Sequence, residues 1–431
     1  MAPIAHLEPM LPDAEALRPR AADVVEEARD LGRHLHPATL RAVAELLRTI
    51  NCYYSNLIEG HNTHPVDIER ALAADYFADP ARRNLQIEAR AHIEVQRAIE
   101  GRLDAEPGTN VCDETFVRWI HEEFYRRIPR ELRIVRHPSE PRDEEVLPGA
   151  LRTFDVQVGR HVAPPWHELN ALLARFAEVY DPRRFARNGT ATGREMFDEP
   201  RALVALAAAH HRLLWIHPFG DGNGRVGRLM TDAYLRRIRL GGQGLWTVSR
   251  GLARQRDRYR EALGAADAER GNDYDGRGAR SAQALHAFCE FFLDVCAGQV
   301  RYMSGVLTID ALLDRVAAYG RAREAGAIPS PGVAAPPAGR PPRGRPPARL
   351  RPAATRLLRA LVAQGPVARG ETPAITGLAG RSARRVVQQL TTEGFVIAAS
   401  HRAPLELRFP AHAAPYLFPG LYSPTTAPSA P

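Results

Sequence analysis

Residues 217–228 read HPFGDGNGRVGR, and the rest of the chain is interpreted from this stretch outward. Apolar residues recur at helical spacing on both sides of it, over residues 203–214 and 226–234. The spacing predicts two helices joined by a short glycine-rich loop.

The loop has the groups that a phosphate site needs. Three glycines in five positions, Gly220, Gly222 and Gly224, allow successive amides to point into one concavity at a helix N-terminus. Arg225 and Arg228 follow in the first turn of the next helix, three residues apart, and guanidinium groups bind phosphates well. This combination predicts an anion site for a chain of phosphates.

Two further side chains of the loop supply chemistry. Asp221 offers one carboxylate, which suffices for Mg²⁺ when substrate phosphates and waters complete the shell. His217 is the one side chain here that accepts a proton near neutral pH, and we expect the nearby arginines to lower its pKa. A lone histidine or a lone Gly-Asn-Gly is usually structural, but the combination indicates nucleotidyl transfer.

The loop resembles, at every specified position, the Fic-domain signature His-x-Phe-x-(Asp/Glu)-Gly-Asn-Gly-Arg-x-x-Arg. The resemblance implies a mainly α fold and transfer of AMP from ATP to a Ser, Thr or Tyr hydroxyl of a target protein. It also implies a role for each residue: His217 as general base, Asp221 as Mg²⁺ ligand, Asn223 with the amides of Gly222 and Gly224 as anion hole, Arg225 and Arg228 as phosphate contacts, and Phe219 as core anchor.

A second motif lies upstream. Residues 38–59 have one apolar helical face, and Gly60 is placed to cap the helix, so Glu59 meets the unfavourable end of the helix dipole. The segment from Ser55 to Gly60 resembles the Fic inhibitory motif (Ser/Thr)-x-x-x-Glu-(Gly/Asn). The resemblance implies that Glu59 pairs with Arg228 and obstructs the γ-phosphate. Ser55, on the same helix face, is expected to orient the Glu59 carboxylate.

A short hairpin is expected before the signature loop. Polar and apolar residues alternate over residues 151–158, Gly159 supplies a turn, and residues 161–163 return. This resembles the Fic flap, which adds a strand to the target protein, so the target is expected at about Leu151 to Ala163. The alternative is a hairpin that only covers the core. Self-modification and a homodimer stay open.

The length of 431 residues favours two or three domains. From about Arg323 to Pro352 the chain is rich in Pro, Ala, Gly and Arg. Seven arginines and one glutamate between residues 321 and 351 carry most of the net charge of +8. We expect an N-terminal helical region at 1–110, a Fic core with a small β-hairpin flap at 111–320, a linker at 321–352, a winged-helix domain at 353–412 and a disordered tail at 413–431. Residues 1–30 show no clear pattern, and residues 65–100 show helices without chemistry.

The C-terminal module carries a rival function. Its expected order of helix, turn, helix and two strands resembles a winged helix, and its second helix is basic. Residues that would face a DNA groove are Arg381, Arg384, Arg385, Gln388 and Gln389. A DNA-binding regulator is therefore one alternative, against a module that only contacts protein. A Fic enzyme that removes AMP with the help of Glu59, or that uses another nucleotide donor, is a further one.

Four cysteines, at positions 52, 112, 289 and 296, have no pairing or metal-site spacing. Reduced thiols in a cytoplasmic protein are the simplest interpretation. We expect no membrane segment, because no uncharged apolar run reaches ~18 residues.

Overall fold

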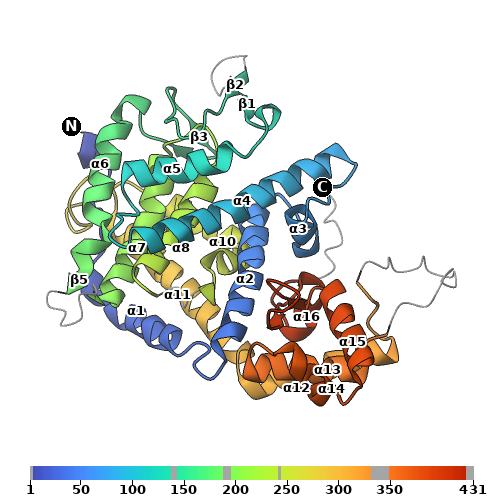
Figure 1. Ribbon diagram of the computed structural model, residues 1–431. Coiled ribbons are helices and arrows are strands. Elements are labelled where there is room, and N and C mark those ends of the chain that lie inside the picture. The colour runs from blue at the N-terminus through green and yellow to red at the C-terminus, as the bar shows by residue number, and fades with distance from the viewer. Residues whose placement is uncertain (1–2, 137–142, 188–195, 241–243, 332–348, 424–431) are drawn as a thin grey trace. The chain divides into compact units, whose positions relative to one another are not determined.

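The computed structural model describes residues 3–136, 143–187, 196–240, 244–331 and 349–423 (Figure 1). Most of these residues are helical, and the strands among them form four two-stranded antiparallel sheets. The predicted mainly α fold is confirmed. The strands are β1 (Ile134–Arg136) with β2 (Asp143–Glu145), β3 (Gln157–Val158) with β4 (His161–Val162), β5 (Ala186–Arg187) with β6 (Met196–Phe197), and β7 (Val396–Ile397) with β8 (Glu406–Leu407).

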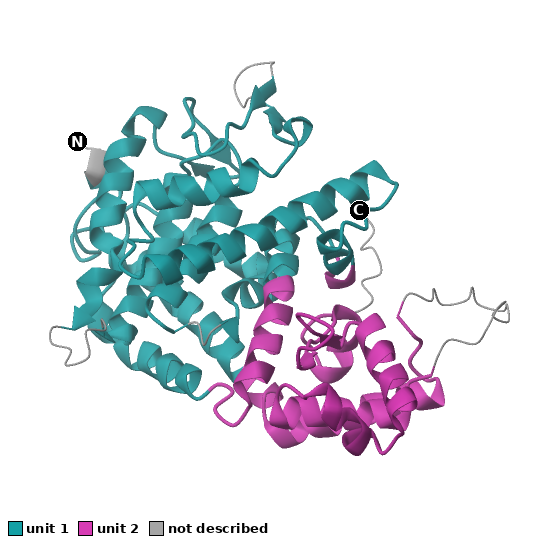
Figure 2. Ribbon diagram, viewed as in Figure 1, with its two compact units in different colours: residues 1–30, 51–63, 67–301 teal, residues 31–50, 64–66, 302–431 magenta. Residues whose placement is uncertain are grey.

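The chain divides into two compact units, shown in Figure 2. The first unit comprises residues 1–30, 51–63 and 67–301, and the second comprises residues 31–50, 64–66 and 302–431. The predicted boundary at residue 110 does not follow this division, because the N-terminal helix packs within the first unit.

The helices are α1 (Ala14–Arg29), α2 (Pro37–Ile58), α3 (Pro65–Leu72), α4 (Pro80–Ala105), α5 (Glu114–Tyr125), α6 (Leu169–Tyr180), α7 (Glu199–Ile216), α8 (Asn223–Arg237), α9 (Val248–Arg254), α10 (Arg256–Ala265), α11 (Ala282–Val306), α12 (Ile309–Ala325), α13 (Pro352–Gln364), α14 (Thr372–Thr376), α15 (Gly380–Thr392) and α16 (Ala414–Leu417).

Helix α7 is the centre of the first unit. It is buried on nearly every side and packs against α1, α6 and α8, as expected of a helix that is apolar all round. Helix α1 was not predicted, although its buried residues recur at helical spacing: Leu17, Ala21, Val24, Val25 and Ala28. Pro19 and the alanine-rich composition obscured that pattern.

The β3–β4 hairpin is present but shorter than the alternation predicts. Gln157 pairs with Val162 and Val158 with His161, and Gly159 adopts φ +61° in the turn. Upstream of it, the buried Arg152 side chain donates to the carbonyl of Phe154, and the Arg152 amide donates to the carbonyl of Pro218 at 3.0 Å. This backbone is therefore held by Arg152 and the signature loop.

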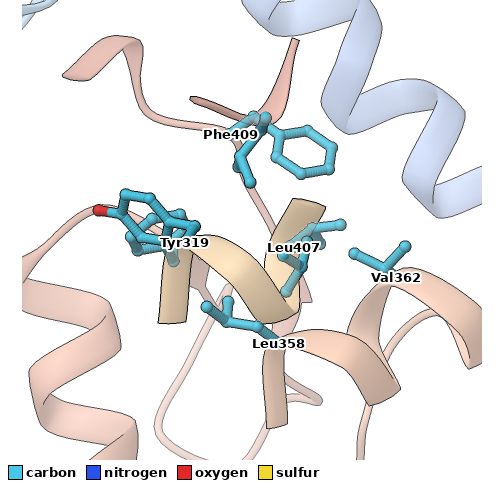
Figure 3. Close-up of a pocket in the computed structure, with 8 residues that line it drawn as sticks. Tyr319, Leu358, Val362, Leu407 and Phe409 are labelled. Carbon is cyan, nitrogen blue, oxygen red and sulfur yellow. The ribbon is translucent and has the colours of Figure 1, made fainter. Parts of the chain in front are cut away.

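The second unit has a small apolar core of its own. Figure 3 shows Tyr319, Leu358, Val362, Leu407 and Phe409 around an apolar cavity in this core. Helix α12 supplies Tyr319 and continues to Ala325, five residues into the predicted linker, because its buried face continues to Arg323. Arg323 is buried there and forms an ion pair with Glu393 at 3.0 Å.

The predicted disordered tail begins too early. Residues 414–417 form α16, Phe418 and Leu421 are fully buried, and the hydroxyl of Tyr422 donates to the carbonyl of Ala411 at 2.6 Å. Apolar burial therefore orders the chain beyond residue 413. The remainder of the tail, 424–431, and most of the linker, 332–348, lie outside the described residues.

All four cysteines are buried and free. Across the described part of the chain, no helix combines the length and the apolar character needed to cross a membrane.

Candidate active site

The signature loop joins α7 to α8, as predicted, and its backbone is shaped by unusual dihedral angles. His217 ends α7 in the left-handed region at φ +50°, and Gly222 caps the start of α8 at φ +80°. A side chain at position 222 would collide with Tyr125, which lies 2.8 Å from the place of a Cβ atom. Phe219 is fully buried and stacks on His121 with ring centroids 4.0 Å apart, so it anchors the loop as expected.

His217 has the geometry of a base. Its Nδ1 lies 3.4 Å from the carbonyl oxygen of Leu214, which can only accept, so Nδ1 carries the hydrogen and Nε2 keeps the lone pair. Burial is the largest cause that lowers the pKa of His217 to about 4, and the positive charges of His161 and Arg152 contribute to the same shift. The neutral form is therefore present at pH 7, as predicted.

The cause of this low pKa differs from the prediction. Arg225 and Arg228 were expected to lower it, but the positive charges that act on His217 come from His161 and Arg152 instead. The reason is position: the two signature arginines belong to α8, whereas His161 and Arg152 belong to the hairpin segment and lie beside the base.

The resemblance implied that Asn223 helps to form an anion hole, but its side-chain amide forms hydrogen bonds within the loop instead. It is buried, its Oδ1 accepts from the amide of Phe219 at 3.0 Å, and its Nδ2 donates to the carbonyl of Phe219 at 2.9 Å. Both ends of the side chain are used within the loop. Asn223 therefore braces the loop.

Asp221 lies at the opposite end of the loop from His217. Tyr125 donates its hydroxyl to Asp221 Oδ2 at 2.6 Å, and Arg225 Nη2 lies 3.5 Å from the same oxygen. Burial raises the pKa of Asp221, but Arg225 and the Tyr125 hydroxyl outweigh it, and the net pKa is below the usual range. Asp221 is an ionised, partly exposed carboxylate.

This donor set suits Mg²⁺ only in part. The described residues contain no group of three or more His, Cys, Asp or Glu side chains that could hold a metal ion. A single carboxylate such as Asp221 fits a Mg²⁺ ion whose other ligands are substrate phosphates and waters.

Arg225 is buried and held from three sides. Glu88 Oε2 lies 3.0 Å from its Nη1, Asp221 lies at its Nη2, and its guanidinium lies 4.8 Å from the ring centre of Phe124. Glu88 also lies 2.8 Å from Nδ1 of His61. Neither Glu88 nor Tyr125 was predicted, because each belongs to a helix with no motif of its own.

Glu59 and Arg228 meet as expected. Glu59 directly follows α2, Gly60 adopts φ +94° at the helix end, and Glu59 Oε1 lies 2.5 Å from Arg228 Nη2. Ser55 was expected to orient the carboxylate, but its hydroxyl accepts from Arg228 Nε at 2.9 Å and its carbonyl accepts from Arg228 Nη2 at 3.1 Å. Ser55 therefore fixes the arginine.

The carboxylate of Glu59 also lies over the start of α8. A Cβ atom on Gly224 would be 2.2 Å from Glu59 Oε1, so only glycine leaves room for it. Burial raises the pKa of Glu59, but Arg228 outweighs it and the net pKa is lowered. An ionised carboxylate thus occupies the helix N-terminus at which an anion was predicted.

Residues 111–235 match the model of the Fic/DOC family. The chain carries a Fic domain. The matched segment holds the β3–β4 hairpin and the whole signature loop, whereas Glu59 and Glu88 reach the Fic domain from residues before it.

Known relatives of this Fic domain are named as enzymes. The protein adenylyltransferase Fic of Nematostella vectensis is 28% identical over 246 residues, covering 54% of this chain and 48% of the relative. Its namesake in Drosophila willistoni is 24% identical over 237 residues, covering 54% and 43%. The crystal structure of a Fic family protein from Desulfovibrio desulfuricans G20 is 18% identical, covers 90% of this chain and 96% of that one, and has a TM-score of 0.47. The chain spans about half the length of the curated relatives it matches.

Proposed function

We propose that this chain is a protein adenylyltransferase that transfers AMP from ATP to a Ser, Thr or Tyr hydroxyl of a target protein. The observation that carries the proposal is the neutral His217, with its Nε2 lone pair available, in one loop with an ionised carboxylate and two arginines. The relatives named as adenylyltransferases support the same reaction.

In the proposed reaction, Nε2 of His217 takes the proton of the target hydroxyl as its oxygen attacks the α-phosphorus of ATP. The bond between the α-phosphorus and the bridging oxygen breaks, and pyrophosphate leaves with the electron pair. Arg225 and Arg228 neutralise the β- and γ-phosphates. Asp221 would hold Mg²⁺, which supplies further charge neutralisation when bound.

We further propose that Glu59 inhibits this reaction. Its carboxylate binds Arg228 and lies against Gly224. If Arg228 binds the γ-phosphate as proposed, the carboxylate occupies the position of that phosphate. Two anions cannot share one guanidinium and one helix N-terminus without strong repulsion. Glu59 must therefore leave before ATP is held productively.

The target protein is proposed to dock on the β3–β4 hairpin. Val158 and Val162 are 52% and 67% exposed, which is unusual for valine, and they lie on the two strands of the hairpin. A short two-stranded sheet with an open edge and exposed apolar side chains can add a strand of a partner through main-chain hydrogen bonds.

The test is AMP transfer from α-labelled ATP in a cell lysate, with wild type, Glu59→Gly and Glu59→Gly/His217→Ala compared. Strong labelling of a lysate band or of the chain itself by Glu59→Gly, weak labelling by wild type and silence of the double variant are expected. Silence of all three, with ATP still bound, would overturn the assignment. Labelling by the double variant would remove His217 from the role of base.

We also propose a second activity, DNA binding by residues 350–410 of the second unit. Helices α14 and α15 are joined by a turn at Gly377, which adopts φ +64°, and a β7–β8 hairpin follows. This order supports the proposal of a winged helix. Residues 350–410 contain nine arginines and three glutamates. Arg381, Arg384 and Arg385 are exposed on α15.

Gln389 differs from its prediction, because its amide donates to the carbonyl of Arg349 at 3.1 Å and to Glu393 at 3.2 Å. The proposed DNA face therefore consists of the three arginines and the exposed Gln388. Fluorescence anisotropy with a labelled duplex tests it. Salt-dependent binding that weakens in Arg384→Ala/Arg385→Ala, but not in His217→Ala, supports the face, and equal binding by both variants overturns it.

A further inference from the structure

His161 ties the return strand of the hairpin to the core. His161, in β4, places its Nδ1 2.9 Å from Asp267 Oδ2 and its Nε2 2.9 Å from the carbonyl oxygen of Trp215. Asp267 lies just beyond α10, and Trp215 lies in the last turn of α7. One side chain therefore joins the hairpin to two elements of the first unit.

The partners of His161 determine its charge. A backbone carbonyl accepts hydrogen bonds and cannot donate them, and the same is true of an ionised carboxylate. Burial raises the pKa of Asp267, but its hydrogen bonds from His161 and His211 outweigh it, and the carboxyl is ionised. Both ring nitrogens of His161 must then carry a hydrogen, so His161 is an imidazolium cation.

The neighbouring His211 does not take this role. Arg212 Nη1 donates to His211 Nδ1 at 3.0 Å, so the single hydrogen of His211 is on Nε2, which faces Asp267 Oδ1 at 3.2 Å and the carbonyl of Leu263 at 3.1 Å. Arg280 also lies close, with Nη1 2.8 Å from the carbonyl of Asp267. The cation that pairs with Asp267 from the hairpin is His161.

The tie lies beside the proposed base. Trp215 precedes His217 by two residues, and the rings of His161 and His217 are 6.3 Å apart. From the other end of the hairpin segment, Arg152 donates from Nε to the carbonyl of His217 at 2.8 Å. The hairpin is thus fixed to the backbone that carries His217.

We propose that the His161–Asp267 pair is a latch that holds the β3–β4 hairpin at a set distance from His217, which makes His161 a positioning residue for the attacking hydroxyl. The proposal rests on the proposed AMP transfer and on target docking at this hairpin. A target strand paired to β3 or β4 inherits the position of the hairpin. A displacement of about 1 Å at the reacting oxygen is enough to slow such a transfer on the order of 100-fold.

The same cation has a second effect on the base. A positive charge 6.3 Å from the His217 ring disfavours the protonated form of His217, and it is one cause of the low pKa of about 4. Loss of the charge of His161 should therefore raise the pKa of His217. A residue that only packed the hairpin would not move that pKa.

The test compares His161→Gln and Asp267→Asn in the Glu59→Gly background, with His167→Gln as the matched control. His167 is an exposed histidine six residues beyond His161 and outside the latch. Both latch variants are expected to lower the rate at saturating ATP on the order of 10-fold or more, with KM for ATP unchanged. His161→Gln should also move the acid limb of the pH profile upward, and His167→Gln should change neither.

Hydrogen exchange of the amides of residues 151–163 gives a readout that needs no activity. Faster exchange in both latch variants and unchanged exchange in His167→Gln support the latch, and equal exchange in all three overturns it. If Glu59→Gly itself labels nothing, the proposed function fails and the exchange result alone decides the latch. Asp267→Asn keeps the shape of its side chain, so it tests the charge even where His161→Gln fails to fold.

Discussion

Among the ion pairs around the signature loop, two have opposite relations to the proposed reaction. Glu59 and Arg228 meet at the start of α8, where the phosphates of ATP would lie. His161 and Asp267 meet on the hairpin side, where the target would lie, and neither belongs to the loop. In the proposed reaction, the first pair breaks for transfer, whereas the second persists.

The difference follows from which partner the substrate needs. Arg228 is only 3% exposed and has one set of donors, so a carboxylate that binds it competes directly with a phosphate. Asp267 has no proposed contact with a substrate, so its pairing with His161 does not compete with substrate binding. In the proposed reaction, the Glu59–Arg228 pair is therefore inhibitory and the His161–Asp267 pair is supportive, because only the first occupies a group that ATP must bind.

The largest effect is expected from Asp221, which belongs to neither pair. Asp221→Asn in the Glu59→Gly background should lower AMP transfer on the order of 100-fold, because the amide is a poorer Mg²⁺ ligand than a carboxylate. A Mg²⁺ titration of labelling measures this. Unchanged transfer in excess EDTA by the parent variant would contradict the metal assignment.

Ser55→Ala separates the two halves of the inhibitory contact, since it leaves Glu59 in place. Loss of the Ser55 hydroxyl removes one hydrogen bond to Arg228, worth about 1 kcal/mol, so transfer should rise ~5-fold, less than in Glu59→Gly. Initial rates of AMP labelling provide the measurement, with the exposed Ser304→Ala as control. A rate equal to wild type would show that Ser55 does not hold the arginine against ATP.

The loop could be predicted from the sequence because its conformation is local. Gly222 at positive φ, the buried Phe219 and the basic first turn of α8 are all encoded within residues 217–228. Glu59 could be predicted for a similar reason, since its motif and its helix end lie together at residues 55–60.

The groups that tune this loop could not be predicted in the same way. Glu88, Tyr125 and His161 come from a helix or strand whose periodicity states which face is buried but not which distant group it meets. The same holds for Asn223 inside the motif, because only the folded loop shows that its amide forms hydrogen bonds with the backbone of Phe219. Long-range packing decides such contacts, and one sequence carries little record of it.

The pH dependence of transfer tests the influence of His161 on His217, and its expected effect is smaller. His217 must be neutral to act as a base, and burial with His161 lowers its pKa to about 4. Transfer by Glu59→Gly should therefore be constant with respect to this group above pH ~5 and about half as fast at pH ~4. Circular dichroism at each pH separates this loss from acid unfolding. A rate that rises from pH 7 toward pH 5 would contradict the base role.

The smallest effect is expected on thermal stability, and it tests the Glu59–Arg228 pair. Glu59→Gln keeps the shape of the side chain but removes its charge, so the buried Arg228 loses its counter-ion and Tm at pH 7 should fall by about 2 °C. The folded-state pKa of Glu59 is lowered, so the charged pair stabilises the fold above the ordinary pKa of a glutamate and loses this contribution as the pH falls through the lowered value. The difference in Tm between wild type and Glu59→Gln should therefore narrow below pH ~4.5. Thermal melts of both proteins from pH 7 downward measure it, and a difference that widens in acid would mean that Glu59 is not held as a carboxylate by Arg228.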